Sequence, residues 1–331
     1  MSMSEVALEM ILTDSDHPRN VPTQSQEADG PIGIGMHLQS SHIREGGLMP
    51  DSIVIGIHGL KNKPAKELLA RWWTTSIQEG LQRNHGKDVH FDFELIYWAN
   101  VQYPNPIPET DIDNPYLKAD GDGPLRRYDP GLLSTTRVFA EKWGGRSIDK
   151  GKDLLGLDKN IDELIGIVFD DLRDYYRERD RRIRIRGLLA DALHRHRNKR
   201  VCLIAHSMGS IIAYDVLRTL ETLPPAIEQF VTIGSPLGLP IVAQHIREEF
   251  GQTTIPRQVR HWTNLADPGD KVALDCTLAD EYRAASGAPD IHDTLVLNGY
   301  VDRSGKRDQH SGYGYLRTPE LADIVHTFLM A

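Results

Sequence analysis

The sequence predicts an α/β protein built on a doubly wound, mostly parallel sheet. From residue 51 onward, short apolar runs alternate with stretches of helical character, an alternation typical of parallel sheets covered by helices. Polar side chains follow directly after several of these runs, as Ser207 follows residues 201–205. Because sites in such folds lie at the carboxyl ends of strands, the same pattern predicts both the fold and the place of its site.

The composition excludes several other classes of protein. The 331 residues are 40% hydrophobic, which is enough for the core of one α/β domain with an insertion. The net charge of −9 gives no overall attraction to nucleic acid. Two cysteines, Cys202 and Cys276, make neither a disulfide framework nor a metal site. No apolar run suits a signal peptide or a membrane span, so we expect a cytoplasmic protein. We also expect it to use no cofactor.

The first hundred residues predict a polar arm, three strands and one helix. We expect residues 1–30, rich in Ser, Asp, Glu and Pro, to form a mobile arm, and residues 31–331 to form the domain. The predicted strands are 32–38 at an edge, 51–57 and 91–98, with a helix at 66–82.

An irregular stretch then interrupts the alternation. Residues from 101 to about 165 contain many Pro, Gly and Asp, and a segment of this length inside a compact domain is usually a lid or a binding loop. We interpret it as a cap inserted over the site, and a disordered insertion is the alternative.

A basic stretch follows the cap. Helical spacing predicts a helix over 161–179, and residues 177–200 carry ten Lys or Arg. Such a stretch could contact phosphate or an acidic membrane surface, but solvated helix faces explain it more simply.

The remaining elements follow the same alternation. Residues 201–205 predict a buried strand with a helix starting near Met208. Further predicted strands are 229–233, 260–265 and 294–301, followed by a glycine-rich loop at 308–315 and a helix at 319–330.

Ser207 lies at the turn between strand and helix and is the predicted nucleophile. A serine on so sharp a turn has a strained backbone and an exposed hydroxyl, and the turn needs small residues two positions before and after it, here Ala205 and Gly209. The alternative is a serine that only caps the helix.

The predicted 51–57 strand ends in His58-Gly59-Leu60, a place suited to half of an oxyanion hole. Glycine lets backbone N–H groups turn toward a reaction centre. We expect the N–H groups of Leu60 and Met208 to be the two donors, and a plain strand-to-helix turn is the alternative.

Candidates for the base and the acid follow Ser207 in the chain. His310 is the preferred base because it lies in the loop between the last predicted strand and the last helix. By contrast His292 precedes that strand, His326 lies within the helix, and His206 is expected to point away from the serine. For the acid we prefer Asp270 to Asp267, which precedes Pro268 and has the character of a turn residue. Asp275 or Asp293 is the remaining alternative.

Three segments together resemble the α/β-hydrolase superfamily, and within it the intracellular serine lipases and phospholipases of the DDHD and PGAP1-like kind. They are Ala205–Ser210, Asn264–Ala273 and His310–Tyr313. The resemblance implies that Ser207 is the nucleophile, Asp270 the acid and His310 the base. The acidic, metal-linked cluster of DDHD domains has no match here, and we expect no metal.

These observations predict a serine hydrolase that cleaves carboxylic esters through an acyl-serine intermediate. The expected partner is a small-molecule or lipid acyl ester, with peripheral contact to a membrane left open, and the sequence does not indicate an oligomeric state. An acyltransferase or thioesterase would use the same three residues. A non-catalytic binding protein on the same fold is the third alternative.

Overall fold

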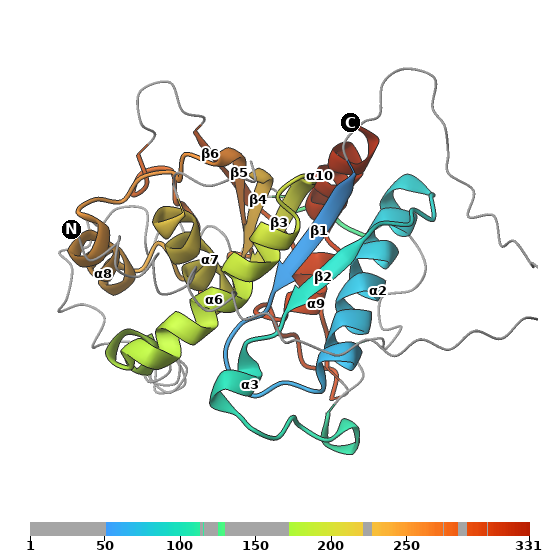
Figure 1. Ribbon diagram of the computed structural model, residues 1–331. Coiled ribbons are helices and arrows are strands. Elements are labelled where there is room, and N and C mark those ends of the chain that lie inside the picture. The colour runs from blue at the N-terminus through green and yellow to red at the C-terminus, as the bar shows by residue number, and fades with distance from the viewer. Residues whose placement is uncertain are drawn as a thin grey trace, which may run out of the picture. The chain divides into compact units, whose positions relative to one another are not determined.

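Six parallel strands form one sheet in the order β2-β1-β3-β4-β5-β6 among the residues that the structure describes (Figure 1). They are β1 (Ser52–Ile57), β2 (Phe93–Ile96), β3 (Arg200–His206), β4 (Ile227–Ile233), β5 (Val259–Ala266) and β6 (Ile291–Leu295). The chain runs from β1 outward to β2 and then returns to β3 on the other side of β1. The strand order therefore reverses between β1 and β3, where a doubly wound sheet opens its ligand crevice.

This computed structural model describes residues 51–112, 115, 125–129, 172–220, 227–273, 275–283, 290–302 and 304–331. The predicted arm at 1–30, the predicted strand at 32–38 and most of the predicted cap lie outside these residues. The described residues belong to one unit, 51–331.

Alternate side chains of the central strands enter two separate apolar layers. Ile53, Ile55 and Ile57 of β1 belong to one layer, and Val54 belongs to the other. In β3, Leu203 and Ile204 divide in the same way. Because both faces are buried, each strand reads as a continuous apolar run rather than as an alternating one, which explains why the central strands were visible in the sequence.

Helices cover both faces of the sheet (Figure 1). The described helices include α2 (Lys66–His85), α3 (Ala99–Gln102), η1 (Glu109–Asp111), α6 (Arg179–Arg195), α7 (Met208–Thr219), α8 (Pro240–Phe250), α9 (Gly312–Leu316) and α10 (Pro319–Met330). Helices α6, α7 and α8 supply one apolar layer, and α2, α9 and α10 supply the other. The predicted α/β class with a doubly wound parallel sheet is confirmed.

The final strand differs from its prediction. It spans 291–295 rather than 294–301, because its partner β5 ends at Ala266, which pairs with Leu295. Residues beyond that point have no strand beside them to continue the ladder. His292 consequently lies within β6 and not before it. The predicted loop at 308–315 also contains a helix, α9, which begins after Ser311.

The described parts of the predicted cap contact two different regions. Its first residues lie beside the loop after β1, since the Ile107 N–H donates to the Lys63 carbonyl at 2.9 Å. Residues 125–129 contact α10 through Arg127, whose guanidinium lies 2.6 Å from Asp323. Whether the segment acts as a lid stays a prediction.

Most cations of the basic stretch at 177–200, which contains α6, are paired with acids. The pairs are Arg181–Glu178, Arg182–Glu249, Arg186–Asp215, Arg195–Glu94, Lys199–Asp92 and Arg200–Glu228. Arg186 is the most enclosed of these, and its guanidinium contacts Asp215 at 2.6 Å and Glu249 at 2.6 Å. These contacts favour the interpretation of the stretch as solvated helix faces.

In the part of the chain that the structure describes, no helix has the length and apolar character needed to cross a membrane.

Candidate active site

The turn between β3 and α7 holds Ser207 in a strained conformation. Its φ of 54° and ψ of −129° lie in a region of backbone angles that residues other than glycine rarely adopt. The Ser207 N–H donates to the Ile233 carbonyl at 3.1 Å, and the Ser210 hydroxyl donates to the Ser207 carbonyl at 2.6 Å. These contacts fix the turn from both sides.

Gly209 shows why this turn needs a small residue two positions after the serine. A Cβ atom at Gly209 would lie 2.6 Å from the Ile57 carbonyl oxygen and 2.7 Å from the His58 carbonyl oxygen. Both neighbours are backbone atoms of the β1 end, so they cannot rotate away. The first turn of α7 therefore packs directly on the residues that precede Gly59.

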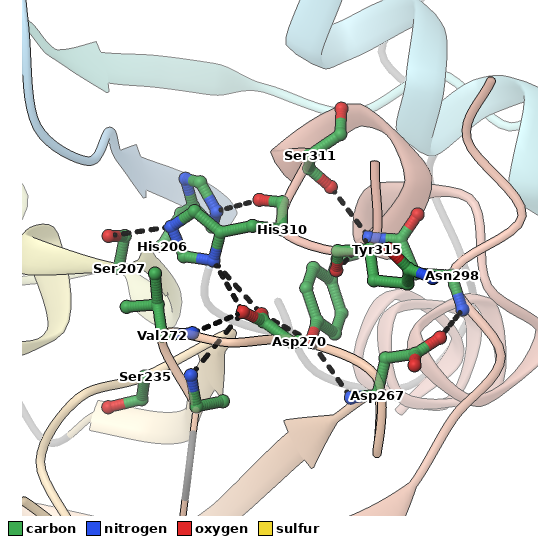
Figure 2. Close-up of polar contacts among 12 residues, drawn as sticks. His206, Ser207, Ser235, Asp267, Asp270, Val272, Asn298, His310, Ser311 and Tyr315 are labelled. Atoms are coloured by element: carbon green, nitrogen blue, oxygen red, sulfur yellow. Dashed lines mark hydrogen bonds and ion pairs between the residues drawn. The ribbon is translucent and has the colours of Figure 1, made fainter. Parts of the chain in front are cut away.

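His310 lies between Ser207 and Asp270 (Figure 2). Its Nε2 is 3.0 Å from the Ser207 Oγ, and its Nδ1 is 2.9 Å from one Asp270 oxygen and 3.0 Å from the other. A carboxylate can only accept, so Nδ1 carries the proton and Nε2 is free to accept from the serine hydroxyl. The structure thus brings together the three residues predicted as nucleophile, base and acid.

Asp270 is held ionised although its side chain is completely buried. Burial alone would raise its pKa, but the His310 ring, the Val272 N–H at 2.8 Å and the Tyr315 hydroxyl at 2.8 Å outweigh that effect. The net shift of the Asp270 pKa is downward. An ionised carboxylate at this point stabilises positive charge on the imidazole.

The other three carboxylates considered from the sequence bind backbone N–H groups instead. Asp267 accepts from Gly269 and Asn298, both at 2.7 Å. Asp293 accepts from the N–H groups of Leu278 and Ala279, and Asp275 from that of Thr277. Of these four carboxylates, Asp270 alone contacts the His310 ring within the described contacts.

His206 is not directed away from the site as expected. Its ring lies 4.9 Å from the His310 ring, and its Nε2–H donates to the His310 carbonyl at 2.9 Å. Burial, with a further contribution from His310, lowers the pKa of His206 to about 3. The ring is therefore neutral near pH 7 and acts as a fixed hydrogen-bond donor behind His310.

His58 determines how the Gly59–Leu60 peptide is turned. The Trp98 N–H donates to His58 Nε2 at 3.1 Å, so the ring proton lies on Nδ1, which donates to the Gly59 carbonyl at 2.8 Å. In a trans peptide the Leu60 N–H points opposite to that carbonyl. Burial, and secondly Lys63, lowers the pKa of His58 well below its usual value, which keeps this tautomer neutral.

The Gly59–Leu60 peptide lies next to the serine. A Cβ atom at Gly59 would be 2.7 Å from the Ser207 Cβ and 3.2 Å from its Oγ. The following residue, Lys61, has a φ of 68°, which is a second strained position, in the loop after β1. Both features suit a loop that presents backbone N–H groups, and the roles of Leu60 and Met208 stay predictions.

Sequence reasoning missed several residues that position this constellation. Gly234, with a φ of 54°, leaves space that a Cβ would fill 2.9 Å from Asp270 and 3.2 Å from His310 Nδ1. Tyr315 links the two aspartates, because its hydroxyl donates to Asp270 and accepts from the Asp267 N–H at 2.8 Å. Asn298 donates to the carbonyls on either side of His310, at Gln309 and Ser311. Of these residues, only Gly234 could have been found from the sequence, because it is a glycine that directly follows a predicted strand.

A metal centre is not part of this arrangement as far as the described residues extend. Among them, no group of three or more His, Cys, Asp or Glu side chains is placed to hold a metal ion.

One comparison with known families finds a match. Residues 172–303 match the family model described as PGAP1-like alpha/beta domain, which is less than half of the 331 residues. The match contains Ser207 and Asp270 and ends before His310. No curated protein matches the chain. The family is hydrolase-like, and together with the parallel sheet it supports an α/β-hydrolase type of fold and confirms the resemblance to PGAP1-like proteins.

Proposed function

We propose that this protein is a serine hydrolase that cleaves carboxylic esters through an acyl-serine intermediate. One observation carries the proposal. The contact of 3.0 Å between Ser207 Oγ and His310 Nε2 continues at 2.9 Å from His310 Nδ1 to Asp270. A neutral serine hydroxyl is a poor nucleophile, and this geometry supplies both the base and the group that orients the base.

In the acylation step, Ser207 Oγ bonds to the carbonyl carbon of the ester while its proton passes to His310 Nε2. The carbonyl oxygen becomes an oxyanion and accepts from the Leu60 and Met208 N–H groups. The bond from carbon to the alcohol oxygen then breaks, and the leaving alcohol takes the proton from His310 Nε2. Asp270 stabilises the imidazolium that exists between these two proton transfers.

Deacylation repeats the sequence with water. His310 takes a proton from water, the hydroxide oxygen bonds to the acyl carbon, and Ser207 leaves with the proton returned by His310. The products are the carboxylic acid, the alcohol and the regenerated serine. A thioester or an alcohol acceptor would pass through the same acyl-serine, so a thioesterase or acyltransferase differs only in the leaving group or the acceptor.

A fluorophosphonate that labels activated serines tests the proposal directly. We expect the wild-type protein to label at Ser207, and Ser207→Ala to lose both the label and hydrolysis of a p-nitrophenyl ester. Ser311→Ala is the matched control, because Ser311 adjoins His310 but contacts Asn298 through its backbone carbonyl rather than its hydroxyl. Labelling of Ser207→Ala at the wild-type level would exclude the mechanism. If neither the wild-type protein nor Ser311→Ala is labelled, a non-catalytic binding protein is favoured.

A further inference from the structure

The loop after β1 carries two lysines, Lys61 and Lys63, whose side chains have different surroundings. Lys61 is exposed, whereas Lys63 is half-buried and folds back along the loop. The Lys63 Nζ donates to the Leu60 carbonyl, three positions earlier. This contact closes the loop around Lys61, the residue with the φ of 68°. Strained positions persist only where the surrounding contacts hold them, and the Lys63 ammonium supplies one such contact.

The peptide groups on either side of Leu60 are both held through their carbonyl oxygens. His58 Nδ1 donates to the Gly59 carbonyl at 2.8 Å, and Lys63 Nζ donates to the Leu60 carbonyl. Because each peptide group is planar, fixing both carbonyls fixes the backbone of Leu60 between them, including the direction of its N–H. Lys63 therefore completes a restraint that His58 provides only for the first of the two peptide groups.

The backbone of Lys63 is anchored to the segment that follows β2, so the side chain extends from a fixed point. Its carbonyl accepts from the Ile107 N–H at 2.9 Å, and its N–H donates to the Asn62 Oδ1 at 2.8 Å. Asn62 in turn donates to the Asn105 carbonyl at 2.8 Å. The contact between Lys63 Nζ and Leu60 thus ties Leu60 to a second segment of the chain and not only to its own loop.

The charge of Lys63 acts on groups next to Ser207. Burial is the largest cause of the lowered pKa of both His58 and His206, and the Lys63 ammonium contributes to both shifts. A Cβ at Gly59, which follows His58, would lie 3.1 Å from His206 Nδ1 and 3.2 Å from the Ser207 Oγ. A positive charge in this region stabilises negative charge that develops beside the serine.

We propose that Lys63 is a positioning residue of the oxyanion hole, which holds the Leu60 backbone so that its N–H meets the oxyanion formed when Ser207 attacks. This inference rests on the proposed function, because the oxyanion exists only if Ser207 attacks an ester. Lys63 acts through Leu60 and not on the substrate. Its effect belongs to the transition state, where the carbonyl oxygen of the ester becomes charged. Its loss should therefore lower kcat and leave KM nearly unchanged.

Kinetics of three variants with a p-nitrophenyl ester test this role. Lys63→Met removes the donor and should lower kcat about tenfold or more with KM within about twofold, since loss of a whole oxyanion-hole donor costs about 10²–10³. Lys63→Arg keeps a charged donor and should restore kcat to within about threefold of the wild-type protein. Lys61→Met removes the exposed lysine of the same loop and should stay within about twofold.

Hydrogen exchange tests the positioning without turnover. In the absence of substrate, Lys63→Met should speed amide exchange in the peptide covering 58–64, because the loop loses a contact that closes it. Lys61→Met should exchange there like the wild-type protein. Because Lys63 is half-buried, its variants should fold, and urea unfolding of each protein checks that faster exchange is local and not a loss of overall stability.

Two results would overturn the proposal. One is a folded Lys63→Met variant with wild-type kcat or with wild-type exchange of the loop. The other is an equal loss of kcat in Lys63→Met and Lys61→Met, which would mean that the reaction responds to the charge of the loop and not to the contact with Leu60. Failure of the proposed function is distinguishable, because the wild-type protein would then neither label with a fluorophosphonate nor hydrolyse the ester. In that case the role in the oxyanion hole fails with it, and the exchange data still show whether Lys63 holds the loop.

Discussion

At the scale of single residues, two aspartates three positions apart have different surroundings. Asp267 and Asp270 belong to the same turn, linked by a hydrogen bond from the Asp270 N–H to the Asp267 carbonyl. Asp267 holds the backbone of Gly269 and Asn298, whereas Asp270 holds the His310 ring. The sequence favoured Asp270 because Asp267 precedes a proline and because the family resemblance implies Asp270 as the acid. It did not indicate that Asn298, which is 31 residues away, donates to Asp267.

Exchanging each aspartate for asparagine should separate these two roles. Asp270→Asn should lower kcat for a p-nitrophenyl ester by about 10⁴, since the imidazole then lacks its orienting carboxylate. Asp267→Asn should keep most of the activity but reduce the free energy of unfolding by about 1–3 kcal/mol, because one of two buried N–H donors loses its acceptor. Ester hydrolysis and urea unfolding of both variants measure this. The opposite ranking of activities would mean that Asp267 is the acid.

At the scale of elements, the predictions agree with the structure wherever the apolar pattern of an element's own residues defines it. The predicted strands at 51–57 and 201–205 and the helix at 319–330 agree with β1, β3 and α10 to within a residue or two. The end of β6 and the helix α9 depend instead on the end of β5 and on the contacts of Asn298 with the loop. Such limits come from neighbours distant in sequence, which local patterns of hydrophobicity do not contain.

Two helical glycines test whether the packing of α7 on β1 is required. A Cβ at Gly209 would press on two backbone carbonyls at 2.6 and 2.7 Å, while Gly187 in α6 has nothing within 4 Å. Gly209→Ala should therefore destabilise the protein by about 1–3 kcal/mol and reduce hydrolysis. Gly187→Ala should be neutral or stabilise by up to about 1 kcal/mol, because alanine favours the helix.

Urea unfolding and ester hydrolysis of both glycine variants give the comparison. If Gly209→Ala matches the wild-type protein in both measurements, the close approach of α7 to the end of β1 does not constrain the site.

At the scale of the whole molecule, the sheet gathers residues that the chain keeps far apart. The loops after β1, β3, β4 and β5 meet at one edge, and Ser207 and His310 are 103 positions apart. The order serine, aspartate, histidine was visible in the sequence because each follows a recognisable strand. The supporting positions of His58, His206 and Tyr315 were not, since each acts through a contact that only the assembled sheet creates.

Assembly of this edge buries neutral histidines, which makes stability depend on pH. The pKa of His206 is about 3 in the folded chain, against about 6.5 when unfolded. Between these values the unfolded chain binds the extra proton, so the free energy of unfolding falls as pH falls through that window. His58, whose pKa is also lowered, acts in the same direction.

We expect His206→Gln to flatten this dependence. Urea unfolding of the wild-type protein between about pH 6.5 and 4.5 should lose up to about 1.4 kcal/mol per pH unit through His206 alone. The glutamine variant should lose less, with its amide still able to donate to the His310 carbonyl. His261→Gln on the exposed part of β5 controls for removing a histidine and should keep the wild-type slope. Equal slopes in all three proteins would contradict a neutral, buried His206.

The backbone angle of Ser207 also bears on how this sequence can evolve. A residue with a side chain in that conformation costs about 1–3 kcal/mol, and glycine would remove most of the cost. Selection for stability alone would therefore replace this serine, and under the proposed function selection for its hydroxyl opposes the change. A lineage that did not need the proposed nucleophile would gain stability by losing Ser207, whereas buried strand positions such as Leu203 would remain under the same constraint as before.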